Sequence, residues 1–149
     1  MYISAEGKQG RTIIARLRPG HDIFQSLNQL LVKHGIQAGY IPVLQGGFKN
    51  LKLVSMTFGE REDCPQDVEL EYRQPLEYFG MGIVAQVQGK PSIHIHLTAA
   101  QAGNKSITGH LVSGEIVLLT EVVVVELLDV TVTRKADPEV FDLPLLHIQ

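Results

Sequence analysis

Apolar and polar residues alternate along much of this chain, and a period of two places successive side chains on opposite faces of a β-strand. The alternation is clearest in residues 11–18, 51–58, 68–72 and 76–87. Residues 11–18 end at Pro19-Gly20, a pair that is typical of a turn. The pattern therefore predicts a chain built mainly from strands.

Glycine pairs between apolar runs predict turns. Gly46-Gly47 follows residues 36–44, and we expect it to turn the chain so that residues 48–58 form a hairpin with them. Ser113-Gly114 predicts another turn. Pro42 cannot donate a backbone hydrogen bond, so it favours a sheet edge or a bulge.

The segment Gln88-Gly89-Lys90 predicts antiparallel pairing of residues 83–87 with residues 92–98, because so short a connection joins neighbouring antiparallel strands. Gly80 and Gly82 lie inside the first of these strands. A glycine there indicates a bulge or a close approach of another backbone.

One segment has the helical period instead. From His21 to Gly35 the apolar residues recur at 23, 24, 27, 30 and 31, which is the stripe of an amphipathic helix. Asp22 suits its N-terminal end, while Lys33 and His34 suit its C-terminal end. Gly35 favours the left-handed conformation that ends a helix.

Residues 115–133 form the most apolar stretch and predict one or two long strands covered on both faces, because consecutive valines pack well on a sheet. Glu121 and Glu126 interrupt this stretch. We interpret both as solvent-facing at the sheet edge, and as alternatives consider a partner for a metal-bound histidine or a general base. Asp137-Pro138 predicts a turn before the apolar segment 143–146, which we expect to dock on the body or on a neighbouring subunit.

Composition narrows the class of protein. The chain has 149 residues, of which 44% are hydrophobic and 19% are charged, so we expect residues 1–149 to form a single compact domain. Its one cysteine, Cys64, excludes an internal disulfide. No signal-peptide core or membrane span is evident, which favours a cytoplasmic protein. The net charge of −3 gives no overall electrostatic footprint for nucleic acid, and no phosphate-binding glycine motif occurs.

The candidate chemistry lies in residues 91–97, PSIHIHL. If this segment is a strand, His94 and His96 share one face while Ile93, Ile95 and Leu97 share the other. Residues i and i+2 of a strand lie roughly 6.5–7 Å apart, a span from which two imidazoles can bind one ion. A hydrogen-bonded polar role on a half-exposed strand is the alternative for each histidine.

A third histidine follows a polar, glycine-containing connection, residues 101–106, that can fold the chain back on itself. His110 would then lie beside His94 and His96. Three neutral imidazoles without a nearby cysteine favour Zn²⁺ or another borderline divalent ion, with the fourth position left for water.

Several motifs together resemble one family, and their order matches over nearly the whole chain. They are Arg18-Pro-Gly20 before the helix, Leu44-Gln-Gly-Gly47, Pro91-Ser-Ile-His-Ile-His96, Thr108-Gly-His-Leu111 with Gly114, residues 121–127 (EVVVVEL) and Arg134. This set is similar to the plant-and-prokaryote-conserved (PPC) domain in its prokaryotic stand-alone form.

The resemblance implies an α+β fold with a largely antiparallel, mixed β-sheet flanked by a few α-helices. It also implies a homotrimer and a zinc site whose ligands are His94, His96 and His110. Plant members add a basic DNA-binding hook of the Arg-Gly-Arg-Pro type, which this chain lacks. A further likeness, to the zinc enzyme acetolactate decarboxylase, makes catalysis conceivable.

Two functional hypotheses follow. The first is a cytoplasmic homotrimer with a structural or ligand-binding metal site and a regulatory or DNA-associated role. The alternative is a zinc-dependent lyase or hydrolase that acts on a small oxygenated metabolite. In that enzyme Glu121 or Glu115 would be the base, and a carboxylate would be bound by one of three arginines, Arg16, Arg18 or Arg134.

Overall fold

The structure is a computed structural model that describes residues 2–58 and 65–149. Its elements in chain order are β1 (Lys8–Leu17), α1 (Ile23–His34), β2 (Gly39–Phe58), β3 (Pro65–Tyr72), β4 (Leu76–Val87), β5 (Lys90–Gln101), β6 (Lys105–Leu128), β7 (Val132–Asp137), the short 3₁₀ turn η1 (Pro138–Val140) and β8 (Leu143–Ile148). Cys64 lies outside the described residues. None of the helices in this part of the chain is long and apolar enough to cross a membrane.

The prediction of a mainly antiparallel, mixed sheet is confirmed, but the expected flanking by a few α-helices is wrong. The described residues contain one α-helix, α1, and the three-residue turn η1. Short-range alternation fills the remaining sequence, so there is little chain left to form helices.

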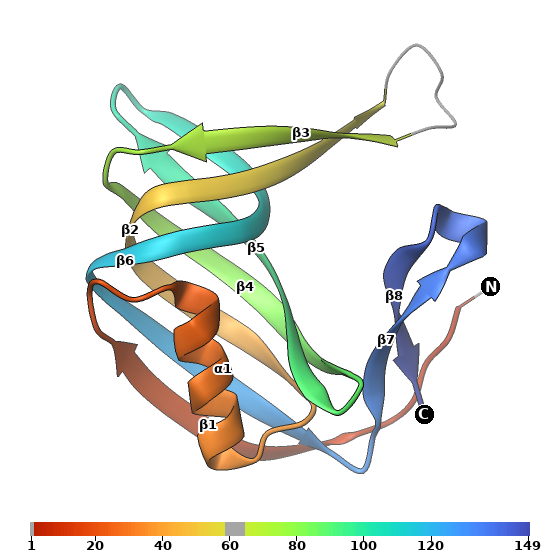
Figure 1. Ribbon diagram of the computed structural model, residues 1–149. Helices are drawn as coiled ribbons and strands as arrows, with labels where there is room; N and C mark the ends of the chain where they lie inside the picture. Colours follow the sequence, from red (N-terminus) through yellow and green to blue (C-terminus); the bar gives the residue numbers. More distant parts are fainter. Residues whose placement is uncertain (1, 59–64) are drawn as a thin grey trace.

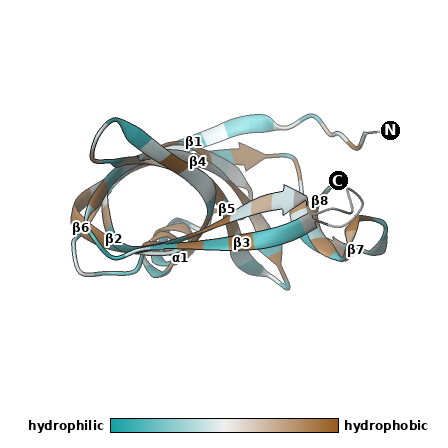
Figure 2. Cartoon of the chain, turned by 90° about the horizontal axis from the view of Figure 1, so that it is seen from above, coloured by the Kyte–Doolittle hydropathy of each residue, from teal (hydrophilic) through white to brown (hydrophobic). Residues whose placement is uncertain are grey.

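The strands form one sheet that closes on itself. Its order is β3-β2-β6-β5-β4-β7-β8, β1 is added along β6, and β2 also pairs with β4. The strands β2, β6, β5 and β4 therefore complete a ring, which Figure 2 shows end on. These pairings are antiparallel, whereas β4 and β7 meet in parallel at Gln86 and Thr133.

The inner faces of the ring supply the main hydrophobic core. Its largest fully buried side chains include Phe48 on β2, Ile95 on β5 and Ile116 on β6. Helix α1 adds Ile23, Leu27 and Leu31, the buried stripe that the sequence predicts, and it packs against β5 and β6 (Figure 1).

The ends of α1 are as predicted. The carboxylate of Asp22 accepts a hydrogen bond from the backbone N–H of Gln25, and Lys33 and His34 lie in the last turn. Gly35 has a φ of 65°, the left-handed conformation that ends the helix. A turn at Pro19-Gly20 precedes the helix, again as predicted.

Two predicted turns are wrong. Gly46-Gly47 lies inside β2, a continuous strand of 20 residues, and Ser113-Gly114 lies inside β6, which has 24 residues. Both glycines are needed for close contact instead: a Cβ on Gly46 would lie 2.2 Å from the carbonyl oxygen of Leu119, and one on Gly114 would lie 3.1 Å from the ring of Phe48. The second half of β2 pairs with β3 rather than with the first half of β2.

The other predictions for the strands hold. Pro42 lies at a break in register between β2 and both of its neighbours, which is the expected bulge. Gly80 and Gly82 allow close backbone approach, because a Cβ on either would lie under 3 Å from a carbonyl oxygen of β5. Strands β7 and β8 form a C-terminal hairpin, so the apolar segment 143–146 docks on β7.

Candidate metal centre

The histidine segment is strand β5, and its side chains divide as predicted. Ile95 and Leu97 are buried in the core. His94 is half-buried and His96 is exposed on the other face of the strand. Strand β4 holds β5 in place through a regular register in which Ile83 faces His94 and Met81 faces His96.

His110 reaches the pair because β5 and β6 form a tight hairpin. The connecting residues include Gly103 and Asn104, which both have positive φ values (79° and 56°). The register that follows places His110 directly opposite His96. Two residues further along, the hydroxyls of Thr98 and Thr108 form a hydrogen bond of 2.9 Å on the same face.

The three imidazoles converge. One ring nitrogen from each of His94, His96 and His110 can be chosen so that all lie within 4.8 Å of one another. Donor atoms bound at about 2.0–2.1 Å to one tetrahedral ion lie roughly 3.4 Å apart, so modest ring rotations would complete the site. The rings of His94 and His96 are nearly parallel, with centroids 5.0 Å apart, and His110 lies across both.

The surroundings favour neutral rings. Burial lowers the pKa of His94 to about 4, and the nearby charges of His110, Arg134 and His96 act in the same direction. Burial also lowers the pKa of His110, together with His96 and Arg134, while Asp67 opposes this shift. A neutral imidazole has the free lone pair that a metal ion needs. The donor set therefore fits a borderline divalent ion such as Zn²⁺.

Two charged residues from other elements lie near the histidines. Arg134 comes from β7, and its guanidinium donates a hydrogen bond of 2.9 Å to the carbonyl oxygen of Pro144. Asp67 comes from β3, which is positioned by its pairing with β2. The sequence analysis had Arg134 among its candidates but missed Asp67, because no motif or spacing connects Asp67 to the histidines.

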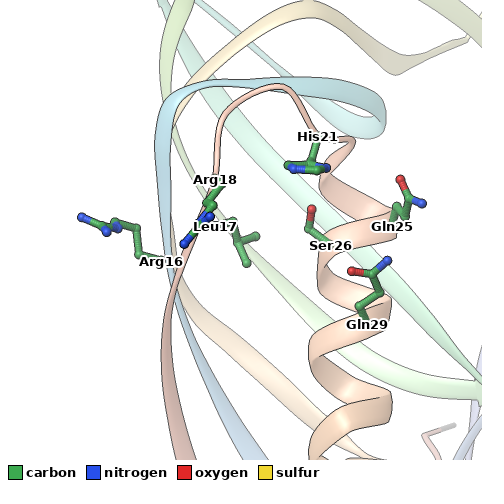
Figure 3. Close-up of a pocket in the computed structure, with 7 residues that line it drawn as sticks. All are labelled: Arg16, Leu17, Arg18, His21, Gln25, Ser26 and Gln29. Atoms are coloured by element: carbon green, nitrogen blue, oxygen red, sulfur yellow. The ribbon is translucent and has the colours of Figure 1, made fainter.

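Arg16 and Arg18 lie elsewhere. They line a cavity of about 210 Å³ between β1 and α1, together with His21 and polar side chains of the first turns of the helix (Figure 3). In that view the side chain of Arg16 points away from α1.

The carboxylates proposed as bases are also occupied elsewhere. Glu121 accepts a hydrogen bond from Gln45, and Glu115 forms an ion pair of 2.7 Å with Lys49 and accepts a hydrogen bond from Asn50. The structure therefore does not bring either glutamate together with the histidines.

The interpretation of Glu126 as solvent-facing is wrong, although Glu121 is exposed as expected. Glu126 is 7% exposed and pairs with Arg11, whose side chain donates hydrogen bonds of 2.7 and 2.8 Å to the two carboxylate oxygens. Arg11 also donates to the carbonyl oxygen of His34 at the end of α1. This cluster joins β1, β6 and the helix, so its role is structural.

Comparison with known proteins gives matches to a domain family and to solved structures. The profile of the Plants and Prokaryotes Conserved (PCC) domain, the family also abbreviated PPC, matches residues 4–128. No curated protein matches the sequence.

Three solved structures illustrate the likeness. A metal-containing protein from Archaeoglobus fulgidus is 27% identical, with a TM-score of 0.80 over 97% of this chain and 99% of its own. A plant- and prokaryote-conserved protein from Pyrococcus horikoshii, 23% identical, has the same TM-score over 97% of both chains. A protein from Ralstonia eutropha, provisionally named as DNA-binding, is 26% identical, with a TM-score of 0.74 over 91% of this chain and 90% of its own.

Proposed function

Because the chain belongs to the Plants and Prokaryotes Conserved domain family, we propose that it is a cytoplasmic, homotrimeric, single-domain regulatory protein that binds a divalent metal through His94, His96 and His110. The observation that carries this proposal is the convergence of the three imidazoles within 4.8 Å. Zn²⁺ is the ion that this donor set favours, with the fourth position open to water or a ligand.

The name of the relative from Archaeoglobus fulgidus supports the metal, since that protein is called metal-containing and is 27% identical over nearly its whole length. Lowered pKa values for His94 and His110 support it further, because protons compete less with the ion.

The outer surface of the ring supports the homotrimer. Apolar side chains lie next to one another across β1, β6, β2 and β4: Ile14 faces Val123, which faces Val43, and Tyr40 faces Ile83. Among these, Ile14 is 79% exposed, and the nearby Phe79 and Met81 on β4 are also exposed. A contiguous apolar surface of this kind is typical of an interface with another chain.

Metal analysis and size measurement test the two parts of the proposal separately. Elemental analysis of the purified protein should find about one equivalent of zinc per chain, and light scattering during size-exclusion chromatography should give three times the mass of the chain. An absence of metal that persists after Zn²⁺ is offered in excess would refute the metal site, and a stable monomer would refute the trimer.

The regulatory role draws on relatives provisionally named as DNA-binding. With a net charge of −3 the chain offers little general attraction for phosphates, so any binding would depend on a local surface of the trimer. A mobility-shift assay at about 0.15 M salt, with and without Zn²⁺, tests DNA association. The absence of a shift in both conditions would remove DNA from the proposal and leave the metal site and the trimer in place.

A further inference from the structure

Arg134 differs from the other arginine that the fold holds in place. Arg11 is neutralised by Glu126 through two hydrogen bonds between their side chains. Arg134 is half-buried, and among residues 2–58 and 65–149 no carboxylate lies within 4 Å of it. Half-burial without a counter-charge is unfavourable, because a charge removed from water needs a partner of opposite sign.

The guanidinium of Arg134 is fixed in one orientation, and one of its edges is free. Its Nη1 group donates to the carbonyl oxygen of Pro144 at 2.9 Å, which anchors the side chain to the β7–β8 hairpin. Its Nε atom is buried and has no hydrogen-bond acceptor among the described residues. Nε and Nη2 together form the edge of a guanidinium that binds a carboxylate through two parallel hydrogen bonds.

Arg134 also lies at the histidine cluster. Strand β7 runs beside the β4–β5 hairpin, with Thr133 paired to Gln86 (Figure 1). The charge of Arg134 is close enough to lower the pKa values of both His94 and His110. A positive charge in this place opposes the binding of a cation, so it serves no purpose for the metal alone. An anion that contacts the ion and the arginine at once would offset this repulsion.

We propose that Arg134 makes the three-histidine centre a binding site for a small carboxylate, held between the open coordination position of the metal and the free edge of the guanidinium. This inference rests on the proposed metal site. It assigns the ligand class of that site: a small organic anion with a second oxygen that can reach the ion, such as a hydroxy or oxo acid.

The proposal predicts a reversal of sign that a structural role would not give. In the absence of a carboxylate, Arg134→Met should bind Co²⁺ at least as tightly as the wild type, since a repelling charge is gone. With the 2-hydroxy acid lactate present, the wild-type protein should bind Co²⁺ at least tenfold more tightly than without it, and Arg134→Met should show no such gain. Binding of metal and of anion must assist each other by the same factor.

The experiment uses full-length protein and follows the visible absorption of Co²⁺ as metal or lactate is added. Arg73→Met, which replaces an exposed arginine, is the matched control and should behave like the wild type. Propane-1,2-diol replaces the carboxylate of lactate by an uncharged group and should not increase Co²⁺ affinity. Inorganic phosphate forms a separate arm.

The outcomes are distinguishable. Failure of the wild type to bind Co²⁺ would refute the proposed metal site, and with it this inference. Binding of Co²⁺ with an equal effect of lactate on the wild type and on Arg134→Met would overturn the inference and leave the metal site intact. A larger gain from phosphate than from lactate would overturn the assignment to carboxylates. A gain from lactate that only Arg134→Met loses supports the proposal.

Discussion

The two ends of strand β6 contrast in how their pairing is determined. At its start, β6 follows β5 after a connection of three residues, and the register runs without interruption from Gln101 and Lys105 to His96 and His110. In its middle, β6 passes the bend of β2 at Gly46-Gly47 and the register shifts. There Leu118 has a φ of 63° and is 80% exposed, an unusual conformation for a leucine.

The difference shows which parts of this fold are local. A short hairpin connection determines the register of both strands, so the histidines meet wherever the hairpin forms. The bend in the middle exists because β2 must pair with β4 on one side and β6 on the other to close the ring. Its strained residues are stable only within the complete sheet. The predictions below test this contrast, from the largest expected effect to the smallest.

Gly46→Ala should disrupt the bend most severely. The added Cβ would lie 2.2 Å from the carbonyl oxygen of Leu119, and the φ of 156° is unfavourable for alanine. We expect the free energy of unfolding to fall by about 3 kcal/mol or more, measured by denaturant titration. Gly103→Ala in the hairpin is the control: its φ is 79° but no atom lies within 4 Å, so the loss should be about 1 kcal/mol. Equal losses in both variants would contradict the contrast.

His96→Ala should weaken metal binding without affecting the fold. His96 is exposed and directly opposite His110, so its removal costs a ligand but little packing. We expect affinity for Zn²⁺ to fall on the order of 100-fold or more, measured by calorimetry, with the thermal midpoint of the metal-free protein unchanged. His21→Ala, which replaces an exposed histidine before α1, should bind Zn²⁺ like the wild type. Unchanged affinity in His96→Ala would rule out the three-histidine site.

Tyr78→Phe tests the polar contact beside the bend. The hydroxyls of Tyr78 and Thr120 form a buried hydrogen bond of 2.7 Å, and the ring of Tyr78 stacks on Phe48 with centroids 3.9 Å apart. The variant keeps the stacking but leaves the buried Thr120 hydroxyl without its partner, so the free energy of unfolding should fall by about 1–2 kcal/mol. Tyr40→Phe, at a half-exposed position, should differ from the wild type by less than about 0.5 kcal/mol. A loss no greater than that of the control would show that the hydrogen bond is unimportant.

Acid should weaken the contact between the far end of β6 and β1. Hydrogen bonds from Arg11 lower the pKa of Glu126 from 4.5 to about 2. A carboxyl group whose pKa is lower in the folded state stabilises the fold above its unfolded pKa and loses this effect as the pH falls toward the folded value. The thermal midpoint should therefore decrease between pH 5 and pH 2, and this decrease should be smaller in Glu126→Gln. Parallel curves for the two proteins would show that the pair does not contribute to acid unfolding.

The sequence by itself determined the features that depend on near neighbours. The alternation in residues 91–97 was enough to place His94 and His96 on one face, and the polar connection after them was enough to bring His110 beside the pair. The helix and its two ends followed from a stripe of apolar residues, Asp22 and Gly35. Each of these depends on interactions within a few residues along the chain, where patterns and turn preferences act directly.

Only the tertiary structure decided what depends on distant strands. A glycine pair has the same local preferences in a turn and in a bent strand, and closure of the ring selected the bent strand at Gly46-Gly47. Glu126 could not be separated from Glu121 until β1 brought Arg11 beside it. Arg134 and Asp67 reach the histidines from β7 and β3, which arrive there by pairing with β4 and β2. The periodicity of a strand gives the face on which a side chain lies, and the partner across that face is chosen by the pairing of the whole sheet.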